Sequence, residues 1–123
     1  MLDKMTRYVY LIEYGKQLGD FPETEKTDEH RVHGCTSVVY LTSTYRDGKV
    51  YYQGFADAQI VKGMVAVLVK SLSGLTPDEI LAIEPTFIKE SGISEALTPT
   101  RQGGFFNIFK RMQEEARRWK EMQ

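Results

Sequence analysis

The spacing of the apolar residues changes along this chain, and each spacing predicts a different element. Up to residue 18 the spacing is that of a helix, at Met5, Tyr8, Val9, Leu11, Ile12 and Leu18. Gly19 and Pro22 then predict the end of this helix. Residues 20–30 are acidic and poor in apolar side chains, which is typical of a solvated loop.

Two runs of β-branched and aromatic residues follow, at 38–45 and 50–55. Asp47 and Gly48 lie between them, and this pair is suited to a turn with positive φ angles. The two runs therefore predict an antiparallel hairpin. Arg31 and Val32 are available as a short third strand.

Helical spacing returns after the hairpin. Asp57 is in position to cap a helix that Gly74 ends. The core face of this helix is expected to comprise Val61, Met64, Val65, Leu68 and Leu72. Thr76 to Glu79 holds the residues of a capping box with proline at the first helical position, so a short helix is expected to end before Pro85.

The last third of the chain repeats this device. Phe87 and Ile88 predict a brief turn that Gly92 ends, and Thr98 with Pro99 starts a long final helix. Its apolar face is Phe105, Phe109, Met112, Ala116 and Trp119. Its charged residues, among them Arg111 and Glu115, are expected to form a solvent-exposed face. The expected fold is α+β: a small antiparallel sheet of about three strands with several helices packed on one face, in a single domain over residues 1–123.

Charge and hydropathy exclude several partners. The net charge is −1, from 16 basic and 17 acidic residues, which gives no field to hold a phosphate backbone. No apolar run approaches the ~18 residues that span a bilayer, and the N-terminus has no secretory signal. We therefore expect neither nucleic acid nor membrane as a partner. A reducing compartment is expected, the cytoplasm or the plastid stroma, where a free thiol persists.

Cys35 is the single cysteine, which excludes an intramolecular disulfide. Such a residue is either a small packing residue or a chemical group. Gly34 leaves the thiol open on one side, and His30, Arg31 and His33 lie close in sequence. A positive charge near the sulfur favours the thiolate over the thiol, whose free pKa is about 8.5.

Other uses of these side chains fit the composition less well. His30, His33 and Cys35 fall short of the donors that a zinc site needs. An iron–sulfur cluster needs about four thiolates. A Cys-His hydrolase needs a catalytic partner residue for Cys35, and the sequence does not identify one. We therefore predict no resident metal.

Three segments carry a family resemblance. Residues 31–41, with Gly34-Cys35-Thr36-Ser37, resemble the Gly-Cys-Gln-Ser segment of the SufE family, the sulfur acceptors that partner cysteine desulfurases. Residues 56–63 resemble the family's Asp-Ala-x-Ile-Val-Lys-Gly helix start, and residues 97–104 its Leu-Ser/Thr-Pro-Ser/Thr-Arg-x-x-Gly segment. Thr36 replaces the usual Gln and Tyr40 the usual Trp.

The resemblance implies a SufE/NifU-like fold and a sulfur relay. Cys35 would accept persulfide sulfur from a SufS-like or CsdA-like cysteine desulfurase, stimulate that enzyme and pass the sulfur to an iron–sulfur scaffold. The chain would not itself be an enzyme and would need no cofactor, because the pyridoxal phosphate belongs to the desulfurase. Candidates for supporting or partner-binding roles are His33, Gly34, Asp57, Lys62 and Arg101. Formation of a homodimer stays open. The alternative is a non-catalytic interaction module with a structural cysteine.

Two expectations concern the surroundings of the thiol. Residues 36–41 are apolar enough to be half buried, so Cys35 should lean toward an apolar pocket that raises its pKa. Arg101 falls in the first turn of the last helix, where the helix dipole disfavours a cation. A carboxylate of the chain, the anionic persulfide or a partner surface should therefore compensate its charge.

Overall fold

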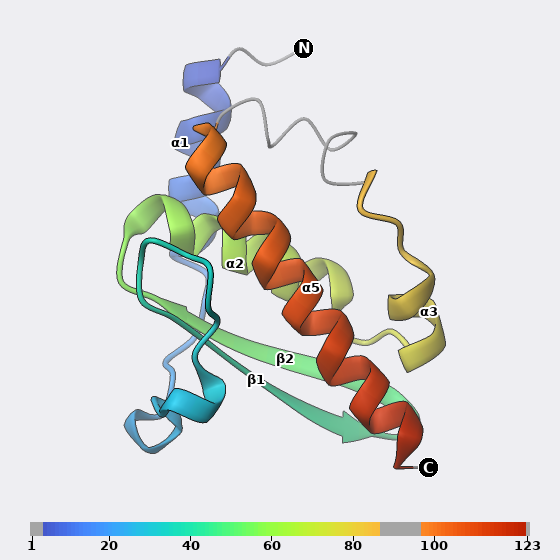
Figure 1. Cartoon of the computed structure of the whole chain (residues 1–123). Coiled ribbons are helices and arrows are strands. Elements are labelled where there is room, and N and C mark those ends of the chain that lie inside the picture. Colours follow the sequence, from blue (N-terminus) through green and yellow to red (C-terminus); the bar gives the residue numbers. More distant parts are fainter. Residues whose placement is uncertain (1–3, 87–96, 123) are drawn as a thin grey trace.

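The computed structural model describes residues 4–86 and 97–122. In chain order the elements are α1 (Lys4–Gly15), the 3₁₀ turns η1 (Glu23–Glu25) and η2 (Asp28–His30), β1 (Val39–Arg46), β2 (Lys49–Ala56), α2 (Gln59–Leu72), α3 (Pro77–Ala82) and α5 (Pro99–Glu121). This is the expected α+β fold (Figure 1). The turn predicted at Phe87, Ile88 and Gly92 lies outside the described residues.

The predicted hairpin and its turn at Asp47 and Gly48 are confirmed. β1 and β2 pair antiparallel from Val39 opposite Ala56 to Arg46 opposite Lys49. Asp47 and Gly48 adopt φ angles of 52° and 78°, as a two-residue turn of this type requires. The expected third strand is reduced to one bridge between Arg31 and Tyr40, because the chain bends away at residues 33–34.

The two faces of the hairpin are covered differently. The face toward α2 and α5 is apolar and buried, at Val39, Leu41, Val50, Tyr52 and Ala56. On the other face Phe21 lies over Tyr40 and Phe55, with ring centroids 6.3 and 6.2 Å away. In Figure 1, α5 runs diagonally across α2 toward the turn end of the hairpin.

The predicted core faces of the two long helices are confirmed. All five residues named for α2 are buried, and so are Phe105, Phe109, Met112 and Ala116 on α5. Trp119 is partly buried and stacks on Tyr45 with ring centroids 5.6 Å apart. The core therefore lies between α5, α2 and the inner face of the hairpin.

Helix α1 forms as predicted but ends at Gly15 and not at Leu18, because residues 16–18 form tighter turns with bonds to the third residue before each. Its apolar positions are not all buried. It packs on α2 at Gly63, where a Cβ atom would collide with the backbone carbonyl of Leu11. This close approach buries Leu11, while Met5 and Val9 stay 70% and 49% exposed. Val9 lies roughly 200° around the helix from Leu11, so both residues cannot face α2.

The predicted caps have mixed outcomes. Thr76 and Glu79 form the full capping box of α3, with bonds of 3.1 and 2.8 Å, and Thr98 accepts from the Arg101 amide at 3.3 Å. The predicted cap at Asp57 is wrong, since Ala58 is the N-cap residue of α2 and makes no side-chain cap bond. Asp57 instead extends the hairpin pairing by two bonds to the backbone of Val38.

Candidate functional site

The cysteine loop, residues 33–37, joins the bridge at Arg31 to β1 and passes the first turns of α5. Cys35 is partly buried in it, and its Sγ donates to the carbonyl of Gly104 at 3.6 Å. Val61 and Met64 of α2 complete the wall of a hollow of about 10 Å³ at the thiol. That volume holds at most about one water molecule, so the hollow has no room for a small-molecule substrate.

The charge state of the thiol follows from this burial. Desolvation raises the pKa of Cys35, and the positive charge of Arg31 opposes that effect only in part. The expected leaning of Cys35 toward an apolar pocket is confirmed. Because even a free thiol has a pKa of about 8.5, the resting side chain at neutral pH is a protonated thiol.

Arg101 shares the hollow with Cys35. It reaches there from the first turn of α5, where Thr98 caps the helix. Within residues 4–86 and 97–122, no carboxylate forms an ion pair with its guanidinium. A cation at a helix N-terminus thus lines the same hollow as the thiol, and it is available to an anion from outside the described fold.

The other residues predicted for the site do not all lie at the thiol. His33 and Gly34 are exposed in the cysteine loop itself. Asp57 fixes the start of β1, because its carboxylate accepts from the Val38 amide at 3.1 Å. Lys62 is exposed and lines a separate hollow, beside Phe55, and does not line the hollow at Cys35.

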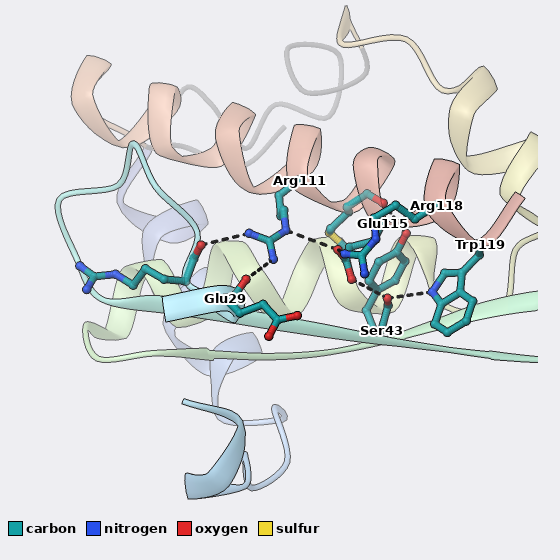
Figure 2. Close-up of polar contacts among 9 residues, drawn as sticks. Glu29, Ser43, Arg111, Glu115, Arg118 and Trp119 are labelled. Carbon is teal, nitrogen blue, oxygen red and sulfur yellow. Dashed lines mark hydrogen bonds and ion pairs between the residues drawn. The ribbon is translucent and has the colours of Figure 1, made fainter. Parts of the chain in front are cut away.

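Asn107 and Arg111 contact the segment that leads to the thiol, and neither was a candidate from the sequence. The Asn107 amide donates to the carbonyl of Gly34 at 3.0 Å. The Arg111 guanidinium donates to the carbonyls of Arg31 at 3.0 Å and Glu29 at 2.7 Å. Figure 2 shows this guanidinium between the loop segment and α5. The expectation of a wholly exposed charged face was therefore wrong, because carbonyls outside regular structure need donors.

Glu115 also departs from the expected solvent-exposed face of α5. The residue is only 8% exposed, and its carboxylate accepts from Ser43 and Arg118 at 2.8 Å each. Arg111 lies 3.6 Å from the same carboxylate. The four-residue spacing of 107, 111 and 115 places all three side chains on one helix face, which was the available sequence signal. Figure 2 shows Arg111 and Glu115 on this face.

Comparison with known proteins identifies the family. The sequence profile described as SufE, Fe-S metabolism associated domain, matches residues 1–116. The chain belongs to the SufE family. The cysteine loop, the start of α2 and the start of α5, which carried the resemblance, all lie within this match.

SufE-like relatives and a solved structure match most of this chain. The chain is 50% identical to an uncharacterized SufE-like protein of Synechocystis, over 93% of this chain and 72% of that protein. It is 35% identical to the cysteine desulfuration protein SufE of Plasmodium falciparum, over 80% of this chain but only 41% of that longer protein. The solution structure of a hypothetical protein from Thermus thermophilus matches with a TM-score of 0.80 and 28% identity, covering 95% of this chain and 86% of that one.

His30, which lies close to Cys35 in the sequence of this SufE chain, makes its contacts with a different residue. His30 is held by Glu25, whose backbone carbonyl and carboxylate lie 2.9 and 3.3 Å from its Nδ1. Across residues 4–86 and 97–122, no three potential His, Cys, Asp or Glu ligands gather around a metal position.

In the same residues no helix is both long and apolar enough to cross a membrane. A larger hollow of about 340 Å³ lies by Ser43, Arg111 and Trp119.

Proposed function

We propose that this chain accepts sulfur from the persulfide of a cysteine desulfurase, and that Cys35 is the accepting group. The observation that carries the proposal is the single thiol of a SufE family chain in a hollow of about 10 Å³. A thiol with no room for a small molecule beside it fits a sulfur donor that another protein carries. The name of the Plasmodium relative, a cysteine desulfuration protein, supports the same chemistry.

The transfer is a thiol exchange in which atoms and electrons balance. The Cys35 thiolate attacks the terminal sulfur of the partner's persulfide, and a bond forms between that sulfur and Cys35 Sγ. The sulfur–sulfur bond of the partner breaks, and its cysteine leaves as a thiolate. The proton that Cys35 loses to solvent is matched by the one that the leaving thiolate takes up, so no external oxidant or reductant is needed.

The resting geometry protects the sulfur until a partner docks. In the hollow, Cys35 is a protonated thiol with a raised pKa, which is slow to oxidise and slow to attack. Movement of the loop out of the hollow returns the pKa toward its ordinary value. Arg101 lines the hollow and forms no ion pair with a carboxylate among the described residues, so it can meet the anionic persulfide or an acidic partner group.

The division of labour follows from this chemistry. The desulfurase, SufS-like or CsdA-like, holds the pyridoxal phosphate and cleaves cysteine, and this chain needs no cofactor of its own. By removing the persulfide the chain frees the desulfurase for another turnover, so it acts as an activator and not as a complete enzyme. The sulfur then passes to an iron–sulfur scaffold. A reducing compartment, the cytoplasm or the plastid stroma, suits a resting thiol.

The proposal is tested by desulfurase turnover, measured as the alanine left when cysteine loses its sulfur. Wild-type protein should raise the turnover and Cys35→Ser should not. Ser71→Ala should act like the wild type because it changes an exposed hydroxyl outside the cysteine loop and keeps the thiol. Full activation by Cys35→Ser would leave an activator that carries no sulfur.

The second candidate is a non-catalytic interaction module in which Cys35 only packs. The observation that favours it is the contact of Cys35 with the hydrophobic core. A thiol reagent applied to the folded protein separates the two candidates. A relay cysteine is labelled as its loop opens, whereas a packing cysteine reacts only when the chain unfolds.

A further inference from the structure

Helix α5 holds the approach to Cys35 by side-chain bonds to backbone carbonyls. Arg111 donates to Glu29 and Arg31 at 2.7 and 3.0 Å. One turn earlier, Asn107 donates to Gly34 at 3.0 Å. Gly34 has a φ of +85°, and a Cβ atom there would collide with the Asn107 amide, so loop and helix are in direct contact immediately before the thiol.

These restraints differ in strength. Arg111 makes two charge-assisted bonds, is 18% exposed, and is further oriented by the carboxylate of Glu115 (Figure 2). Asn107 makes one neutral bond to the loop, at a partly exposed position. The neutral bond is therefore the weaker of the two and opens first.

The far end of the loop is also fixed. The Val38 amide donates to the Asp57 carboxylate at 3.1 Å, and the Asp57 amide donates to the Val38 carbonyl at 3.2 Å. Between Gly34 and Val38, the thiol makes one long hydrogen bond, from Sγ to Gly104, and packs against the hydrophobic core. A short segment is thus fixed at both ends, by Asn107 at Gly34 and by Asp57 at Val38.

We propose that Asn107 is a positioning residue that holds the cysteine loop closed, and that Cys35 reaches a partner's persulfide when the bond from Asn107 to Gly34 opens. Arg111 keeps the upstream segment in place during this movement. The purpose of the opening rests on the proposed function. The restraint itself is a property of the isolated chain and is measured without a desulfurase.

The thiol reports the position of the loop through its ionisation. In the closed position α2 presents only the uncharged Val61 and Met64 to the hollow, α5 presents Arg101, and the loop's own segment contributes Arg31. Opening transfers Cys35 to water and lowers its pKa toward the ordinary value. Alkylation of the thiolate therefore has a pH midpoint above the ordinary thiol value, and the midpoint falls when the loop opens more often.

The test is the rate of Cys35 alkylation by iodoacetamide in the isolated full-length chain, measured across pH. Asn107→Ala should raise the rate at neutral pH about 2- to 10-fold, the effect of losing one neutral hydrogen bond on an equilibrium, and should lower the pH midpoint. Gln113→Ala is the matched control. Gln113 lies on the same helix and also donates to carbonyls, those of Ile80 and Ile83, at 3.1 and 3.0 Å. Its loss should leave the labelling of Cys35 unchanged.

A second variant separates the bond from the bulk of the side chain. Asn107→Leu keeps the approximate volume and removes the donor, and it should label as fast as Asn107→Ala. Wild-type rates and midpoints in both Asn107 variants would overturn the proposal, and so would equal acceleration by Gln113→Ala, which would indicate general loosening. Desulfurase activation by Cys35→Ser would instead overturn the proposed function and leave these labelling results as they are.

Discussion

Glu115→Ala should be the most destabilising change among the charged residues of α5, although the sequence presents it as one of several surface charges. The carboxylate is the shared acceptor for Ser43 and Arg118 and lies beside Arg111. Ser43 also accepts from the Trp119 indole at 2.9 Å. Glu115 therefore joins β1 to α5 at a position that solvent barely reaches (Figure 2).

The magnitude is set by the partners. The bond from the Ser43 hydroxyl to a buried carboxylate contributes about 1.5–3 kcal/mol. The Arg118 side chain is 66% exposed, so its ion pair contributes less than about 1 kcal/mol. Arg111 keeps both of its carbonyl partners and is not left as an unpaired charge. The free energy of unfolding should therefore fall by about 2–4 kcal/mol.

Urea denaturation measures this loss, with Trp119, the single tryptophan, as the fluorescent probe. Because its indole bonds to Ser43, circular dichroism should be followed in parallel to report the whole chain. Glu114→Ala is the matched control, since it removes an exposed carboxylate one position away and should change stability by less than about 0.5 kcal/mol. A Glu115→Ala protein as stable as this control would refute the assigned network.

Three further variants test the surroundings of the thiol. Gly34→Ala should cost about 1–2 kcal/mol for its left-handed φ, and adding Asn107→Ala should recover any further loss caused by the collision; no recovery would contradict that contact. Arg101→Ala should change the free energy of unfolding by less than about 0.5 kcal/mol yet weaken desulfurase activation, whereas parallel losses would indicate an internal carboxylate partner. Asp57→Asn should speed Cys35 alkylation by weakening the bond from the Val38 amide, and an unchanged rate would remove Asp57 as a restraint.

Local signals predicted the elements well, because each depends on residues a few positions apart. The turn at Asp47 and Gly48 and the box at Thr76 and Glu79 both form as expected. Asp57 shows the limit of such signals. A carboxylate just before a helix is able either to cap that helix or to accept from a backbone amide of a neighbouring strand. Only the tertiary pairing of Asp57 with Val38 decides between the two.

The polar face of α5 could not be predicted for a different reason. Arg111 bonds to the carbonyl of a residue 80 positions earlier, and a backbone carbonyl has no residue type that a sequence pattern would reveal. Glu115 likewise depends on Ser43, 72 positions away. The placement of Cys35 was easier to predict from the sequence. The apolar run after it predicted a partly buried thiol with a raised pKa, in agreement with the structure.

The most direct test of the central claim is the intact mass of this chain after mixing with a cysteine desulfurase and cysteine. Sulfur transfer by thiol exchange predicts an added mass of about 32 Da per sulfur, located on the peptide that contains Cys35 and removed by a reducing agent. The gain should require both the desulfurase and cysteine, and Cys35→Ser should show none. An unmodified Cys35 in a mixture whose desulfurase is turning over would contradict the assignment of Cys35 as the sulfur acceptor.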